Sequence, residues 1–323
     1  MNDKPLVTVN ILSFNRKDEL RNTLTKVYEQ DYKNIEVIVV DNSSSDGSAE
    51  MVKNEFPSVR LIQMEKNVGI AGWNEGFKVA KGEYVLVLDD DSYPDRNALL
   101  QVVNILLEKN KVGIVALNIF DKSRNIYETK DFSPPFKDFI GCGVLIRKSC
   151  IDEIGGFDNR FFIYAHETDF SIRLLNAGYL IDYCDEAIAY HRNLVAAGSK
   201  PAFSKYRFVY QSLSYVKLIN KYLQPEQIKK YKRKLLLNRF LVALYFCMLK
   251  DFIKLLKLIS KELPDNQRVF INQEIISLYN FNVEIFSRYY FNRLFQYQPR
   301  KYYPFLYLKT LFSPLARKKL LLE

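Results

Sequence analysis

The feature that most constrains this chain is an apolar run that ends in three consecutive carboxylates. Residues 84–88 read Tyr-Val-Leu-Val-Leu, and Asp89, Asp90 and Asp91 follow at once. Leucine and β-branched residues without alternation are typical of a strand that is covered on both faces, as in a parallel sheet. Asp has a low strand propensity, so the strand should end where the carboxylates begin. We therefore expect a layered α/β fold in which this strand delivers acidic groups to a cleft.

Three adjacent negative charges need a positive partner, and two interpretations of them are open. Carboxylate oxygens are hard ligands that suit Mg²⁺ or Mn²⁺ already carrying phosphate. Alternatively, the Asp-Ser-Tyr-Pro sequence that begins at Asp91 is good turn and helix-cap chemistry, and the acids would then simply be solvated. The surrounding motifs favour the metal interpretation.

Apolar runs alternate with helical stretches through the first part of the chain. Strands are expected at residues 6–12, 35–40, 59–64, 84–88 and 112–117. This alternation predicts right-handed βαβ units and a largely parallel sheet flanked by helices. Ligands bind outside the carboxyl ends of such strands, so Asp41 and residues 89–91 should face one crevice, unless Asp41 only closes an Asx turn. No GxGxxG or GxxxxGK[ST] motif is present, so a diphosphate would have to be held through a metal ion.

The two halves of the chain differ sharply in charge. Residues 1–199 hold 23 Lys and Arg against 30 Asp and Glu, whereas residues 200–323 hold 24 against 7. We therefore place a domain boundary near residues 198–201, between a catalytic domain at 1–199 and a basic, mostly helical region at 200–323. Four cysteines without a CxxC pair argue against zinc or a disulfide framework and fit a reducing compartment. The N-terminus shows no signal-peptide pattern, and no apolar run approaches the ~18 residues of a membrane span.

Several stretches resemble the motifs of the family 2 glycosyltransferases, in the family's order. They lie at residues 7–16, 39–48, 67–74, 89–91, 140–147, 155–158 and 161–170, and together they cover most of residues 5–195. The resemblance implies the α/β fold that binds nucleotide-diphospho-sugars, called GT-A, with a C-terminal helical region added here. It also implies an enzyme that transfers a sugar with inversion.

On the donor side, the resemblance implies a role for each motif residue. Asp41 would hydrogen-bond the nucleobase, Asp89 or Asp90 the ribose, and Asp91 the Mn²⁺ or Mg²⁺ ion that carries a UDP- or dTDP-linked sugar. His191 is expected to ligate the metal or contact the diphosphate, although a lone His is often only a surface or core residue. The other residues expected at the donor site are Leu12, Phe14, Asn15, Arg16 and Asn74.

On the acceptor side, residues 155–158 resemble the family's GGFD loop, and residues 161–170 its acidic base motif. The loop consists of Gly155, Gly156, Phe157 and Asp158. The base motif departs from the usual pattern, because His166-Glu167 stands where two acids are common. By alignment the base falls on Glu167, with Asp169 as the alternative. Both carboxylates could instead only cap the following helix and pair with Arg173.

The back half combines basic residues with apolar helical stripes, as at residues 252–263, and with an aromatic, basic tail at residues 288–322. Such helices can bind the interface of an anionic bilayer, or they can pack as an ordinary bundle with solvated lysines. The sequence therefore favours a cytoplasmic glycosyltransferase, peripheral at the inner face of the membrane, with a saccharide or polyprenyl-diphosphate-linked acceptor. A catalytically silent nucleotide-sugar-binding protein is one alternative. A nucleic-acid-binding protein is another, although the acidic front half opposes it.

Overall fold

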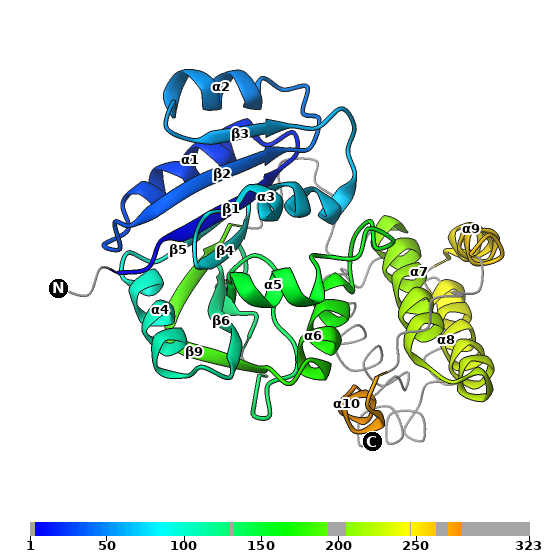
Figure 1. The fold of residues 1–323 in the computed structure, drawn as a ribbon. Helices are drawn as coiled ribbons and strands as arrows, with labels where there is room; N and C mark the ends of the chain where they lie inside the picture. Colours follow the sequence, from blue (N-terminus) through cyan, green and yellow to red (C-terminus); the bar gives the residue numbers. More distant parts are fainter. Residues whose placement is uncertain (1–3, 130–131, 193–204, 246, 263–270, 280–323) are drawn as a thin grey trace. The chain divides into compact units, whose positions relative to one another are not determined.

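The structure is a computed structural model that describes residues 4–129, 132–192, 205–245, 247–262 and 271–279. The chain divides into two compact units, Met1–Leu194 and Val195–Glu323 (Figure 1). The boundary expected at residues 198–201 and the tail at residues 288–322 lie outside the described residues.

The first unit is an α/β structure built around one sheet. Its strands are β1 (Val7–Ser13), β2 (Ile35–Asp41), β3 (Arg60–Gln63), β4 (Tyr84–Asp89), β5 (Ser92–Pro94), β6 (Val112–Asp121), β7 (Ile126–Tyr127), β8 (Val144–Arg147) and β9 (Leu180–His191). Its helices are α1 (Lys17–Tyr28), α2 (Ser48–Glu55), the short 3₁₀ helix η1 (Gly69–Gly72), α3 (Trp73–Val79), α4 (Ala98–Glu108), α5 (Lys148–Ile154) and α6 (His166–Asn176).

The strands form one mixed sheet in the order β3-β2-β1-β4-β8-β6-β9-β5, with β7 paired to β6. Strands β1 to β4 are parallel to one another, as the alternation of strands and helices predicts. Strand β8 instead runs antiparallel between β4 and β6, because the chain returns from β6 through the β7 hairpin and not through a crossover helix. This return places the residues before β8 beside the end of β4.

Both faces of the sheet are covered, which explains the apolar strands. Val9 and Ile11 of β1 belong to one buried cluster with residues of α1, α2 and α4, such as Leu24 of α1. Each fully buried side chain of this size contributes about 1.5–3 kcal/mol to stability. On β1 Asn10 donates a hydrogen bond from Nδ2 to the carbonyl of Trp73 in α3, at 2.9 Å. A Cβ on Gly76 would lie 2.1 Å from Asn10 Oδ1, so only glycine allows this approach of helix to strand.

The second unit is helical in its described part. It contains α7 (Lys205–Tyr222), α8 (Pro225–Tyr245), α9 (Leu249–Ile259) and α10 (Gln273–Leu278). Phe208 and Val209 of α7, Val242 and Ala243 of α8 and Leu255 of α9 share a buried cluster. Helix α8 ends at Tyr245, and α9 begins at Leu249. Among these described helices, none combines the length and apolar character that crossing a bilayer requires.

Candidate active site

The carboxyl ends of three parallel strands meet at one edge of the sheet. The register pairs Ser13 of β1 with Asp41 of β2, and Leu12 with Asp89 of β4. The backbone N–H of Phe14, just past β1, donates to Asp90 Oδ2 at 3.0 Å. The predicted donor residues at these strand ends therefore do come together, as expected for a ligand-binding edge of an α/β sheet.

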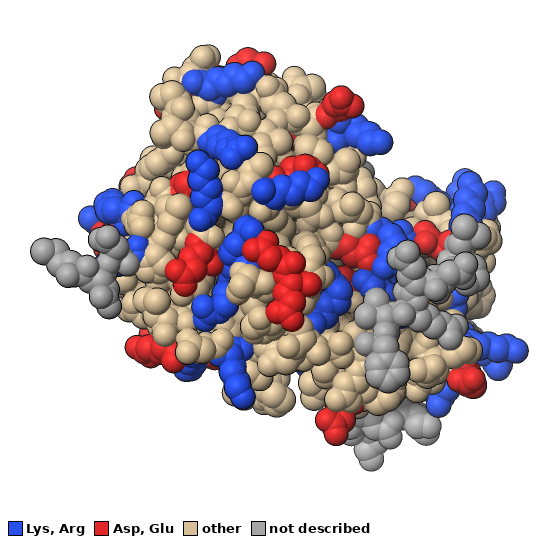
Figure 2. Space-filling model, viewed as in Figure 1, with Lys and Arg blue, Asp and Glu red and all other residues tan. Residues whose placement is uncertain are grey.

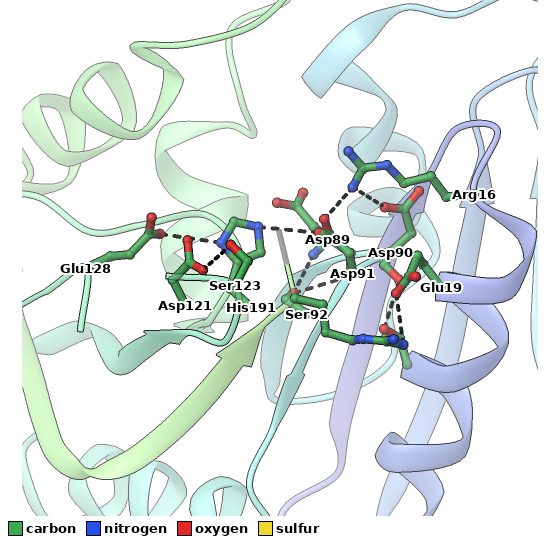
Figure 3. A network of polar contacts seen from close by, with 12 residues as sticks. Arg16, Glu19, Asp89, Asp90, Asp91, Ser92, Asp121, Ser123, Glu128 and His191 are labelled. Atoms are coloured by element: carbon green, nitrogen blue, oxygen red, sulfur yellow. Dashed lines mark hydrogen bonds and ion pairs between the residues drawn. The ribbon is translucent and has the colours of Figure 1, made fainter. Parts of the chain in front are cut away.

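Strand β9 brings His191 to the same place from the far end of the sheet. His191 lies opposite Ser92 of β5 and Asp121 of β6 in the sheet register. Its Nε2 lies 3.5 Å from Asp91 Oδ1, and the N–H of Arg192 donates to the carbonyl of Asp91 at 2.8 Å. Figure 3 shows the imidazole between Asp91 on one side and Glu128 on the other. The two residues predicted as metal ligands, 100 positions apart in the chain, are thus neighbours.

Arg16 lies over the carboxylates and neutralises part of their charge. Its guanidinium forms ion pairs with Asp90, at 3.3 Å, and with Asp91 (Figure 3). Burial would raise the pKa of Asp91, but the hydrogen bond and charge of His191, together with Arg16, hold it below its ordinary value. Burial and the charge of Asp91 raise the pKa of Asp89 to about 6. Burial raises the pKa of Asp90 to about 7, although Arg16 opposes the shift. Asp89 and Asp90 are therefore protonated more easily than a free aspartate. A bound cation would favour their charged forms.

The donor atoms at this edge suit a divalent cation. Among the residues that the structure describes, ligand atoms of Asp89, Cys142 and His191 lie within 4.8 Å of one another, and so do those of Asp121, Glu128 and His191. Carboxylate and imidazole donors are those that Mn²⁺ and Mg²⁺ accept. The second group is already paired with a cation, because Arg124 forms ion pairs with Asp121, at 2.5 Å, and with Glu128. The residues present therefore fit a metal on the side of His191 that faces Asp91.

Glu128 holds the other side of the imidazole ring. Its Oε2 lies 3.4 Å from His191 Nδ1. A carboxylate on one ring nitrogen fixes the tautomer that presents the other nitrogen as a free ligand. Burial would lower the pKa of His191, but the hydrogen bond and charge of Asp91 raise it. No sequence motif pointed to Glu128, because a two-strand hairpin after β6 decides where this side chain lies.

Asp41 and Asn15 tie two loops together at the donor edge. Asp41 is buried, and its Oδ1 accepts a hydrogen bond from the N–H of Ser44 at 3.2 Å. This bond spans three residues, one more than the Asx turn considered from the sequence. Asn15 has a left-handed backbone with φ of 52°, and its Oδ1 accepts from the N–H of Ser45 at 2.7 Å. The Asn15 bond joins the loop after β1 to the loop after β2. The nucleobase contact of Asp41 stays a prediction.

Asn74 holds the acceptor loop, a contact that the sequence did not anticipate. Its Nδ2 donates to the carbonyl of Phe157 at 2.8 Å, and its Oδ1 accepts from the N–H of Phe157 at 2.8 Å. Both polar atoms of the Asn74 side-chain amide therefore bond to the backbone of Phe157 in the GGFD loop. Asp158 in turn accepts from Arg160, with one bond at 2.9 Å. The amide of Asn74 thus positions this loop, and the donor contact expected for Asn74 stays a prediction.

The glycine-bearing motif at residues 67–74 packs against the start of the base motif at residues 161–170. Gly69 has φ of +66°, and a Cβ there would lie 2.0 Å from the carbonyl oxygen of Phe162. The next residue, Ile70, donates its N–H to that same carbonyl at 3.0 Å. Only glycine permits this backbone approach. The glycine motif thus positions the base motif beside α3.

Glu167 and Asp169 lie two residues apart on α6 but in different environments. Asp169 is fully buried, and its Oδ2 pairs with Arg173 at 2.9 Å. Arg173 also donates to the carbonyls of Ile154 and Gly156, at 2.7 Å and 2.8 Å. The side chain of Glu167 is 23% exposed, and its charge is among the influences that raise the pKa of Asp89. Asp169 thus anchors the double-glycine loop, whereas Glu167 is partly exposed and close enough to Asp89 for its charge to act on that carboxylate.

His166, the residue before Glu167 in the expected base motif, is part of the core. Its ring centroid lies 5.1 Å from that of Phe157 and 5.9 Å from that of Trp73. Burial lowers its pKa to about 3, against a smaller opposing influence of Asp169. The imidazole is therefore neutral at physiological pH. It packs as an aromatic ring and places Glu167 at the first turn of α6.

A sequence model described as glycosyl transferase family 2 matches residues 8–166. The UDP-Glc:alpha-D-GlcNAc-diphosphoundecaprenol beta-1,3-glucosyltransferase of Escherichia coli is 30% identical over 183 residues, which are 52% of this chain and 69% of that protein. Poly-beta-1,6-N-acetyl-D-glucosamine synthase of Staphylococcus epidermidis is 28% identical over 167 residues, 45% of this chain and 40% of that one. The chain thus spans less than half the length of this second relative.

Two solved structures are similar in fold. A mannosyltransferase from Pyrobaculum calidifontis, solved with GDP-Man and Mn²⁺, has a TM-score of 0.56 at 22% identity, over 81% of this chain and 78% of that chain. GalNAc-T7, solved with UDP, GalNAc and Mn²⁺, has a TM-score of 0.56 at 13% identity, over 72% and 51%. At these identities the likeness concerns the fold, and the expected GT-A architecture is confirmed.

Proposed function

The chain belongs to glycosyltransferase family 2, and from this premise we propose that it is an inverting enzyme that moves a sugar from a UDP- or dTDP-linked donor to a saccharide or polyprenyl-diphosphate-linked acceptor. Nucleotide-sugar-dependent sugar transfer is supported by the family relationship. The donor, acceptor and mechanism proposed here rest on one observation, the contact between Asp91 and His191 at the sheet edge. The charge of Glu167 acts on Asp89 at the same edge.

We place the donor diphosphate at the carboxyl ends of β1, β2 and β4. Asp91 and His191 would hold a Mn²⁺ or Mg²⁺ ion there, with the carboxylate of Asp89 in reach. Such an ion supplies positive charge to the leaving diphosphate. Asp89 or Asp90 would accept from the ribose, and Asp41 from the base. Arg16 forms ion pairs with Asp90 and Asp91. Its guanidinium is therefore placed to contact the diphosphate.

Glu167 is our candidate for the catalytic base. It takes the proton of the acceptor hydroxyl as that oxygen bonds to the anomeric carbon and the nucleoside diphosphate leaves. This single displacement inverts the anomeric centre. Asp169 is not favoured, because its carboxylate is fully buried and paired with Arg173. The acceptor would lie along the GGFD loop, whose backbone Asn74 and Arg173 hold in place.

We also propose that the second unit binds an anionic membrane surface at the cytoplasmic face. On α9, Leu249, Ile253 and Leu256 are 43%, 52% and 39% exposed, and they recur at the spacing of one helix face. Exposed lysines 250, 254 and 257 flank this face. Figure 2 shows several Lys and Arg side chains over the surface that α8 and α9 form. Apolar residues flanked by lysines suit the headgroup region of an anionic bilayer. The relative from Escherichia coli is named for a lipid-diphosphate acceptor, which agrees with such a location.

The direct test is turnover of a panel of UDP- and dTDP-sugars by the full chain with Mn²⁺ and a polyprenyl-diphosphate-linked saccharide. We expect one donor to be consumed, with a product of inverted anomeric configuration. Donor binding without turnover under all acceptors would instead support the silent nucleotide-sugar-binding protein. A parallel salt-dependent DNA titration tests the nucleic-acid alternative, which the comparisons do not favour.

A further inference from the structure

Cys142 is a buried free thiol beside the acidic cluster, and the proposed reaction does not use it. It is 2% exposed and forms no disulfide. Strand β8 pairs antiparallel with β4 so that Val144 lies opposite Val87. Continuing this register by two residues along each strand sets Cys142 opposite Asp89. The thiol is therefore held by the sheet at the position where the carboxylates begin.

Three strands bring three different donor types to this point. Asp89 ends β4, Cys142 precedes β8, and His191 ends β9, and their ligand atoms lie within 4.8 Å of one another. Glu128 lies against Nδ1 of His191, which leaves Nε2 for the opposite side. All three side chains are held by the sheet or its hydrogen bonds, so the group is preorganised.

We propose that Asp89, Cys142 and His191 form a site for a thiophilic divalent cation, with Zn²⁺ the best match. Zinc binds Cys sulfur, His nitrogen and Asp oxygen, and it accepts three protein ligands with an open fourth position. Zinc bond lengths of ~2.0–2.3 Å require the donor atoms to move closer by on the order of 1 Å. As the Zn–S bond forms, the Cys142 thiol releases its proton to solvent. The spacing of the cysteines in the sequence argues against zinc, but this site needs only one of them.

The site should act as an inhibitory one, a consequence that rests on the proposed function. Mn²⁺ and Mg²⁺ prefer oxygen and nitrogen ligands, so they would use Asp91 and His191 and leave the thiol protonated. Zinc binds a given set of such ligands more tightly than Mn²⁺ does. Because both ions need His191, zinc at Cys142 would exclude the ion that carries the donor diphosphate.

Cobalt titration of the full chain, without nucleotide, tests the site itself. Co²⁺ replaces zinc and reports a thiolate ligand by an intense near-ultraviolet charge-transfer absorption. We expect this absorption in the wild type and in Cys150→Ser, a matched variant at another buried cysteine outside the cluster. Cys142→Ser and Cys142→Ala should both lose it while the thermal midpoint and circular dichroism show a folded protein. The proposal is overturned if the wild type lacks the absorption or if either Cys142 variant keeps it.

Inhibition is tested separately, on manganese-supported turnover. The zinc concentration that halves the rate should rise roughly 10- to 100-fold in Cys142→Ser relative to the wild type, and should not change in Cys150→Ser. Equal sensitivity of all three proteins would exclude an inhibitory role for Cys142. If no donor is turned over at all, the proposed function fails, and the cobalt spectra still decide the metal site.

Discussion

The carboxylate edge of the first unit and helix α9 of the second place their charged side chains in opposite ways. At the sheet edge, Asp90 and Asp91 are almost fully buried and paired with Arg16. On α9, lysines 250, 254 and 257 are exposed around an apolar face. A buried charge that loses its partner costs several kcal/mol, whereas an exposed one contributes little by itself and acts through the summed field. Charge at the sheet edge therefore sets local geometry, and in our proposal charge on α9 sets where the molecule binds.

The same contrast recurs within one turn of α6, where it gives the largest expected effect. Glu167→Gln should lower kcat by roughly 10² to 10⁴, the range for loss of a general base, with donor affinity nearly intact. Steady-state kinetics with the identified donor measure this loss. Donor affinity, from calorimetry with Mn²⁺ present, is the second readout.

Asp169→Asn is the comparison variant for that experiment. Because Asp169 is buried and paired with Arg173, its loss should appear mainly as lower stability, by about 3–5 kcal/mol in chemical denaturation. If Asp169→Asn keeps its stability and loses catalysis while Glu167→Gln remains active, the roles of the two acids are the reverse of those proposed.

Asp91→Asn should give the next largest effect. Removing one carboxylate that would bind the metal should cost roughly 10² to 10³ in turnover, because the charge on the leaving diphosphate is no longer balanced. The metal-dependent part of nucleotide binding should be lost with it, and circular dichroism should show an intact fold. Equal manganese-dependent turnover in the mutant and the wild type would rule out this ligand.

The buried His166 predicts how stability depends on pH. Its pKa is about 3 in the folded protein and near 6.5 when unfolded, so the unfolded chain binds the extra proton as pH falls below about 6.5. From pH 7 to pH 5 this single group should remove about 2 kcal/mol of stability. His166→Phe keeps an aromatic ring against Trp73 and Phe157. In urea denaturation at pH 7 and at pH 5, the free energy of unfolding of this variant should fall by about 2 kcal/mol less than that of the wild type. Identical slopes in the two proteins would mean that His166 is not buried in its neutral form.

The smallest expected effect concerns the exposed lysines of the second unit. Lys257→Gln should weaken binding to anionic vesicles by about 1 kcal/mol, or roughly fivefold, because each lysine adds a similar share near a charged surface. Lys111→Gln, an exposed lysine of the first unit, is the matched control. Sedimentation at low and high salt measures both, and salt should reduce binding of the wild type. No sedimentation with anionic vesicles at low salt would contradict the membrane proposal.

Local pattern explains why much of the sheet could be predicted. Residues 37–40 and 84–88 are apolar without alternation, and β2 and β4 lie there, ending at Asp41 and Asp89. Mixed pairing could not be predicted, because the antiparallel strand β8 depends on the hairpin after β6. The candidate site divides in the same way. Asp91 and His191 were expected together, whereas Cys142, Glu128 and Arg124 entered the site only through the sheet register.

By itself the sequence determined which residue types stand at the strand ends, and with them the family and the reaction class, because periodicity and short motifs are local properties of the chain. Only the tertiary structure shows that Glu167 and Asp169 differ in environment, since a burial difference across two residues of one helix arises from packing against α5 and the double-glycine loop. It likewise shows that the amide of Asn74 binds the backbone of Phe157, while the expected donor contact stays a prediction. A side chain's partner depends on which distant strand or loop the fold brings beside it, and that information is not contained in any one stretch of the sequence.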